Sequence, residues 1–192
     1  MFTGIIQTTG TIQSFDKKKG EVIVRAQKTL GLKKGASIAV DGVCLTAERV
    51  RGKRFWVTVM EETIRVTTFH EREAGAVVNL EPSLRVGDPI DGHMVLGHVD
   101  GVGVIIGLRL LKSSTEITVR VPASLRSCCA LKGSLAINGV SVTTASLRGR
   151  NAIISLTPYT LRETNLGAVQ KGDTVNIEID PIARYIRRLK KR

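Results

Sequence analysis

The sequence predicts an all-β protein made of two similar small barrels in tandem, followed by a C-terminal helix. The segment ASIAVDGVCLT (36–46) returns 97 residues later as GSLAINGVSVT (133–143). Short β-branched runs alternate with turn sequences along most of the chain, which is typical of closed or nearly closed barrels. The final residues depart from this pattern and place apolar side chains at helical spacing.

The repeat extends beyond its first block. The same offset aligns ETIRVTTF (62–69) with YTLRETNL (159–166), and the glycine-led blocks 75–81 and 172–178. A unit of this length is the size of a small domain rather than of a solenoid repeat. We therefore expect domains at residues 1–92 and 93–180, with a helix at 181–192.

Strands are expected wherever a β-branched run is bounded by turn residues. Asp41-Gly42 and Asn138-Gly139 lie between apolar runs, a strong hairpin signal. The expected strands include residues 22–24, 37–40, 55–59, 118–121, 135–137, 152–156 and 174–179.

The two copies meet in a segment rich in glycine, proline and aspartate, residues 81–97. Gly97-His98-Val99 then aligns with Gly4-Ile5-Ile6, at an offset of 93 rather than 97. The second copy therefore lacks four residues near its start.

The tail predicts one amphipathic helix. Ile182, Tyr185, Ile186 and Leu189 follow at i, i+3, i+4 and i+7, and Pro181 suits a first helical turn. A helix of about twelve residues is marginal alone, so its apolar stripe is expected to dock, with the tails of sister subunits as candidates.

The bulk composition narrows the function classes. The three cysteines imply no disulfide framework, and the amino terminus shows no signal peptide, so a cytoplasmic location is expected. No apolar run approaches a membrane span. The net charge of +12 raises the alternative of a nucleic-acid binder, but the cations are scattered without interleaved aromatic residues, which favours no nucleic-acid partner.

Matched positions of the two copies differ in chemistry. Cys44 stands opposite Ser141, and His98 opposite Ile5, although each is compatible with a structural role. His93 and His98 lie five apart, which is not a helical zinc pair, and no other Cys or His spacing indicates a metal site.

Seven blocks together resemble the riboflavin synthase family of the trimeric, α-chain type, and the match covers essentially the whole chain. They are MFTGI, ASIAVDGVCLT, ETIRVTT, VNLEPSLRVGD, GHMVLGHVDGVG, KGSLAINGVSVT and GDTVNIEIDPIARYIRRL.

The resemblance implies two tandem six-stranded Greek-key barrels with a C-terminal α-helix that organises a homotrimer. It implies a cofactor-independent, metal-free transferase of riboflavin biosynthesis. Two molecules of 6,7-dimethyl-8-ribityllumazine would give riboflavin and 5-amino-6-ribitylaminouracil by transfer of a four-carbon unit. The active site would lie between the N-terminal barrel of one subunit and the C-terminal barrel of a neighbour. Lumazine synthase is a further candidate partner, since some relatives occupy its shell.

Carried onto this sequence, the resemblance also implies site residues. The positions matching those implicated in catalysis are Cys44, His98, Ser141, Thr143 and Asp180. Ligand contacts assigned to the first barrel are Gly4, Ile5, Ile6, Ser37, Cys44, Leu45, Thr46, Thr58, Val59, Met60, Glu61, Glu62 and Thr63. Those assigned to the second are Gly97, His98, Val99, Ser141, Val142, Thr143, Thr157, Pro158, Tyr159, Thr160, Leu161 and Arg162, with Lys132 reaching a ligand in the adjacent subunit.

Small departures from the family pattern occur at Asp91, Val142 and Tyr159. Tyr159 stands where His or Glu is frequent, which leaves the second pocket less defined. The main alternative is a non-catalytic lumazine- or flavin-binding protein of the same family. Such relatives have lost the reactive Cys and His positions, whereas Cys44, His98 and Ser141 are present here.

Overall fold

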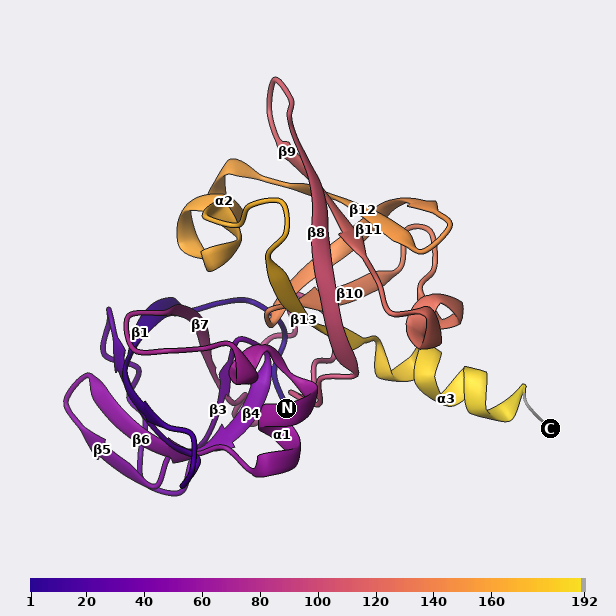
Figure 1. Cartoon of the computed structure of the whole chain (residues 1–192). Helices are drawn as coiled ribbons and strands as arrows, with labels where there is room; N and C mark the ends of the chain where they lie inside the picture. Colours follow the sequence, from indigo (N-terminus) through magenta and orange to yellow (C-terminus); the bar gives the residue numbers. More distant parts are fainter. Residues whose placement is uncertain (191–192) are drawn as a thin grey trace.

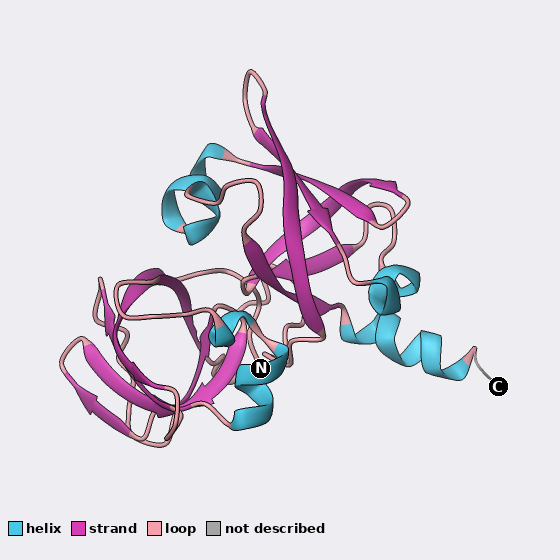
Figure 2. Ribbon diagram, viewed as in Figure 1, coloured by secondary structure: helices cyan, strands magenta, loops and turns pink. Residues whose placement is uncertain are grey.

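The chain folds mostly into strands, arranged in two bodies and followed by a helix (Figures 1 and 2). The computed structural model describes residues 1–190. The predicted tandem all-β architecture with a C-terminal helix is confirmed. Among the described helices, none is long and apolar enough to cross a membrane.

The first half forms one seven-stranded sheet in the order β4-β3-β7-β1-β2-β6-β5. It curls around a core that includes Ile12, Val24, Ile38, Phe55 and Leu80. Its elements are β1 (Thr8–Asp16), β2 (Glu21–Ala26), β3 (Ser37–Val40), β4 (Val43–Thr46), β5 (Arg49–Arg51), β6 (Arg54–Thr58), α1 (Glu61–Val66), η1 (Thr68–His70) and β7 (Val77–Pro82).

The second half is a closed six-stranded barrel in the order β10-β11-β12-β9-β8-β13. Ile105, Ile117, Leu135, Ile154 and Ile177 are fully or almost fully buried inside it. Its elements are β8 (Gly101–Leu110), β9 (Thr115–Arg120), η2 (Ala123–Cys128), β10 (Ser134–Ile137), β11 (Val140–Arg148), β12 (Asn151–Leu156), α2 (Pro158–Glu163), η3 (Asn165–Gly167) and β13 (Thr174–Ile179).

The different closure of the two halves has a local cause. In the second half β11 continues past a register shift between Thr144 and Ser146. At the matching point of the first half the strand breaks: β4 ends at Thr46, Ala47 is buried, and β5 begins at Arg49. The first half therefore has seven strands, where the family resemblance implied six.

The two predicted hairpin turns meet at the interface between the halves. Asp41, Gly42, Asn138 and Gly139 all have positive φ, as a type I′ turn requires. A Cβ on Gly42 would lie 2.7 Å from the backbone nitrogen of Gly139, so the turns pack backbone against backbone.

Buried amides join the halves around these turns. Asn79 donates to the carbonyl of Asn138, and Asn176 donates to the carbonyl of Asp41, each at 2.9 Å. Both asparagines are 1% exposed. Because such amides are costly when unpaired, these bonds fix how the halves sit together.

Helix α3 (Pro181–Leu189) projects from the end of β13 (Figure 1). Asp180 caps it by accepting from the Ile182 N–H at 2.9 Å, and Arg184 pairs with Asp100 at 2.6 Å. The predicted apolar stripe remains exposed on it: Ile182 54%, Tyr185 68%, Ile186 48% and Leu189 69%.

Candidate functional site

Two short segments, residues 1–7 before β1 and residues 95–100 before β8, cross each other between the barrels. The Phe2 N–H donates to the Val95 carbonyl at 2.7 Å, and the Val95 N–H donates back at 3.0 Å. Phe2 is fully buried there with Val95, Ala39 and Ala136. The amino terminus accordingly lies between the two bodies in Figure 1.

Beyond the crossing, each segment contacts the barrel of the other copy. The Ser141 N–H of β11 donates to the Gly4 carbonyl at 2.8 Å, and the Cys44 N–H of β4 donates to the Gly97 carbonyl at 2.9 Å. Ile6 packs on the second core and Val99 on the first.

This crossing corrects one part of the sequence analysis. The ligand contacts carried over from the resemblance grouped Gly4-Ile5-Ile6 with the first barrel and Gly97-His98-Val99 with the second. The backbone bonds to Ser141 and Cys44 pair the segments the other way round.

Glycine is required at both contacts. Gly4 and Gly97 have φ values of +78° and +79°. A Cβ on Gly4 would lie 2.6 Å from Cβ of Ser141, and one on Gly97 would lie 2.5 Å from Cβ of Cys44. Any side chain at either position would force the segment off its strand.

A buried glutamate holds each segment in place. Glu81 of β7 accepts from the N–H groups of Thr3 and Gly4 at 2.7 and 3.0 Å. Glu178 of β13 accepts from the N–H groups of Leu96, Gly97 and His98 at 2.8, 2.9 and 3.1 Å. Burial raises the pKa of each carboxyl, and the donated hydrogen bonds oppose that rise.

The first candidate site combines Cys44, Thr46 and His98. Cys44 is partly exposed, and Thr46 and His98 are exposed. Leu45 and Val59 belong to the core, so their side chains do not face solvent. The other expected ligand contacts of this barrel are accessible to different degrees: Ser37, Thr58, Met60, Glu61, Glu62 and Thr63.

The second candidate site combines Ser141 and Thr143 with the Gly4 segment. Ser141 is partly exposed, Thr143 is exposed, and Val142 is buried in the core. Ile5, between Gly4 and the partly buried Ile6, is 38% exposed.

Residues 157–162 connect β12 to α2 and form its first turns. Thr157 caps the helix, because its hydroxyl accepts from the Thr160 N–H at 3.2 Å. Tyr159 is 64% exposed, with the Arg162 guanidinium 5.4 Å from its ring centroid. Pro158, Thr160 and Leu161 complete this predicted set, and Leu161 packs on the second core.

His93 is a site residue that the sequence analysis missed. Its Nδ1 lies 2.7 Å from Oγ of Ser141, and the residue is 9% exposed. Burial lowers the pKa of the imidazole, while the charge of Asp180 acts in the opposite direction. Asp180, predicted to help activate the Ser/Thr pair, thus acts electrostatically on the histidine bonded to Ser141.

Lys132, predicted to reach a ligand in the adjacent subunit, lies apart from both sites in sequence. Lys132 is exposed in the turn before β10, where its backbone N–H donates to the Thr144 carbonyl at 2.8 Å. Cys44 and Ser141 belong to different barrels, each with its own crossed segment.

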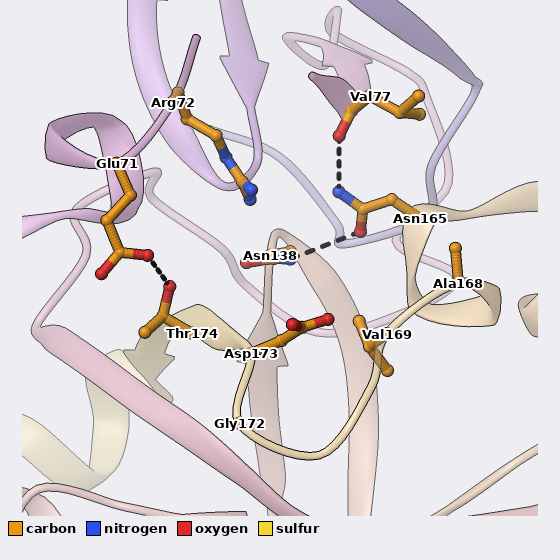
Figure 3. Close-up of a pocket in the computed structure, with 10 residues that line it drawn as sticks. All are labelled: Glu71, Arg72, Val77, Asn138, Asn165, Ala168, Val169, Gly172, Asp173 and Thr174. Carbon is orange, nitrogen blue, oxygen red and sulfur yellow. Dashed lines mark hydrogen bonds between the residues drawn. The ribbon is translucent and has the colours of Figure 1, made fainter. Parts of the chain in front are cut away.

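A hollow of about 340 Å³ lies elsewhere, between η1 and the β13 end of the second barrel (Figure 3). Its polar side chains are largely bonded to one another. Thr174 donates to Glu71 at 2.6 Å, Asn165 donates to the Val77 carbonyl, and Arg72 pairs with Asp41 at 2.8 Å. This hollow is therefore part of the interface between the halves. Within residues 1–190, no group of three or more His, Cys, Asp or Glu side chains is placed to hold a metal ion.

Comparison with known proteins adds to this geometry. The sequence model described as "Lumazine binding domain" matches the chain twice, over residues 3–83 and 96–180. The riboflavin synthase of Bacillus subtilis is 38% identical over 98% of this chain and 89% of its own length. That of Brucella abortus is 37% identical over 98% of both chains.

Solved structures show the same fold. LumP complexed with riboflavin superposes with a TM-score of 0.85 at 26% identity, over 93% of this chain and 99% of LumP. LumP complexed with 6,7-dimethyl-8-ribityllumazine superposes with a TM-score of 0.82 at the same identity and coverage.

Proposed function

The chain belongs to the riboflavin synthase family of proteins with paired lumazine-binding domains, and from that premise we propose that its two crossed sites act together on two molecules of 6,7-dimethyl-8-ribityllumazine. The enzyme is a riboflavin synthase, a transferase. One lumazine donates a four-carbon unit to the other, which yields riboflavin and 5-amino-6-ribitylaminouracil.

The pseudo-equivalence of the two sites is the observation that carries this proposal. Each site combines a strand residue, Cys44 or Ser141, with a glycine-led segment from the other copy, held by Glu178 or Glu81. Two related frames suit two identical substrates. Holding both molecules in a reactive orientation is worth about 7–11 kcal/mol of barrier.

The proposed roles follow the chemistry of the exposed groups. The C7 methyl of one lumazine must lose a proton, and the resulting anion attacks a carbon of the other. His98 offers an imidazole beside the Cys44 site, and imidazole is a side chain that can accept and release a proton. Cys44, Ser141 and Thr143 offer a thiol and hydroxyls to the heterocycles, and Asp180 acts through its charge. The remaining predicted contacts would bind the rings and the ribityl chains through backbone and side-chain groups.

The assembly is proposed to be a cytoplasmic homotrimer joined through α3. Support comes from the exposed stripe on that helix, which is too short to be stable undocked. Lys132 would then reach a ligand bound by the neighbouring subunit. Lumazine synthase stays a proposed partner, and 92/93 and 180/181 stay the proposed domain limits.

The deciding experiment mixes purified protein with 6,7-dimethyl-8-ribityllumazine and no added cofactor. We expect riboflavin and the pyrimidine product in equal amounts, measured by absorbance and chromatography. The similarity to LumP favours one other candidate, a protein that binds lumazine without converting it. Lumazine binding with no riboflavin after prolonged incubation would support that candidate.

A further inference from the structure

His93 is the one histidine that the described structure buries against a proposed site residue. It lies in the connection between β7 and β8, and its N–H donates to the Thr3 carbonyl at 3.1 Å. Its Nδ1 is 2.7 Å from Oγ of Ser141. The preceding Gly92 permits this approach, because a Cβ there would lie 2.0 Å from the Thr3 oxygen and 2.9 Å from Cβ of Ser141.

The second ring nitrogen of His93 lacks a hydrogen bond. Nε2 of His93 is buried and has no hydrogen-bond partner among the described residues. A buried polar atom left unpaired costs about 1–3 kcal/mol. A side chain that served only to tether the connection to Ser141 would not need this second nitrogen.

Among residues 1–190, no histidine is hydrogen-bonded to the Cys44 side chain as His93 is to Ser141. Near the Cys44 site, His98 follows Gly97, whose carbonyl accepts the Cys44 N–H. The two sites therefore each obtain one histidine, by different routes.

We propose that His93 is a positioning residue and proton relay for Ser141, used by the second site alone. This inference rests on the proposed function. Nδ1 accepts the Ser141 hydroxyl hydrogen, which directs the free lone pairs of Oγ toward the ligand. When Oγ takes a proton from a bound lumazine, the hydroxyl proton passes to Nδ1, and the C–H electron pair stays on the lumazine as its anion. The reverse transfer to a later intermediate restores the neutral ring.

The electrostatics favour such a relay. Burial keeps the ring neutral at rest by lowering its pKa, so Nδ1 is free to accept a proton. The negative charge of Asp180, at the junction of β13 and α3, then stabilises the imidazolium that forms.

Three variants test the relay: His93→Asn, Ser141→Ala and the double variant. Asparagine keeps a polar group near Oγ but cannot carry the proton. We expect His93→Asn to bind lumazine with unchanged affinity while kcat falls about 100-fold. If His93 acts through Ser141, adding His93→Asn to Ser141→Ala should cause no further loss of kcat. The matched control is His70→Asn, at an exposed histidine whose Nδ1 hydrogen-bonds a backbone carbonyl in the first half.

Two outcomes would overturn the relay. The first is an unchanged kcat in His93→Asn, which would mean that His93 only tethers the connection to Ser141. The second is a kcat of the double variant that falls by the product of the two single losses. An NMR titration of the His93 ring needs no turnover. Its Cε1–H signal should shift in Ser141→Ala and on lumazine binding. A Cε1–H chemical shift that stays unchanged in both cases would refute the relay, whether or not the protein is active. A parent protein that shows these chemical-shift changes but forms no riboflavin would refute only the proposed function.

Discussion

The two barrels offer the same backbone frame to different side chains. In both, a type I′ hairpin leads to a strand whose second residue donates its N–H to a glycine carbonyl of the other copy. The residue in that position is Cys44 in one barrel and Ser141 in the other. Histidine chemistry also differs, since His98 is exposed and His93 is buried.

The difference separates what a lumazine site needs for shape from what it needs for reaction. The glycines and glutamates, which set the shape, are the same in both copies. The groups that can move protons are not. A reaction in which one lumazine donates carbon and the other accepts it can use this asymmetry, because sites with different proton-transfer groups favour different roles.

The largest effect is expected at the crossing, on which both sites depend. Phe2→Ala removes a fully buried ring from the cluster with Val95, Ala39 and Ala136. We expect a loss of about 3–5 kcal/mol in the free energy of unfolding, measured with urea, and loss of riboflavin formation. The matched control Phe15→Ala, at a partly exposed ring away from the crossing, should cost less and leave turnover intact. Activity near the parent level in Phe2→Ala would mean that the crossing does not shape the sites.

His98→Gln tests the first site by itself. Glutamine keeps polarity but cannot take a proton, so we expect single-turnover conversion to slow by about 10²–10⁴-fold while lumazine still binds. His70→Gln is the control and should convert lumazine at the parent rate. Parent-rate turnover by His98→Gln across the pH range would assign proton transfer to the second site.

Deleting residues 182–192 tests the role of helix α3, which follows the second copy and not the first. Strand β7 runs into the connection to β8, whereas β13 runs into α3. We expect monomers with folded barrels by light scattering and circular dichroism, and turnover reduced by at least about tenfold because substrates are no longer held face to face. A truncated chain that remains trimeric would locate the subunit contacts elsewhere.

Asp41→Asn makes the two interface hairpins alike, since Asn138 occupies the matching turn. Asp41 is 1% exposed and accepts from Arg72, Asn165 and the Asn79 N–H, each at 2.8 Å. The exchange leaves Arg72 without its carboxylate, for an expected loss of about 1–3 kcal/mol by urea unfolding. Adding Arg72→Gln should recover part of that loss, and no recovery would argue that the pair is not coupled.

The smallest effect concerns pH. Burial lowers the pKa of His93, so the folded chain binds fewer protons at this site than the unfolded chain. Its contribution to stability is therefore present above the ordinary histidine pKa and lost as the pH falls through it. Between about pH 8 and about pH 5.5, the parent should lose more stability in urea than His93→Asn does. Equal losses would mean that the ring is hydrated in solution.

The repeat and the turn sequences were enough to predict the tandem all-β architecture and the final helix. Asp41-Gly42 and Asn138-Gly139 did form hairpins, because two consecutive positive φ values favour those residues. The break after Thr46 was not predictable, since the matching stretch of β11 continues with a similar composition.

The crossing of the segments left no local signal in the sequence. A sequence repeat shows which residues of the two copies are equivalent. The same residues are equivalent whether Gly4 contacts its own barrel or the other barrel. His93 was missed for a related reason. It was weighed only for its spacing from His98, and nothing in that spacing indicates its contact with Ser141.

The crossed segments also link the two copies to a dimer of single barrels. A single barrel with the same leading segment could form this strand-to-glycine contact only by exchanging the segment with a second copy of itself. Fusion of two such genes would turn an exchanged dimer into one chain with no change at either site. Neither copy can change its leading segment without altering the other's site, because each segment contacts the other copy's barrel.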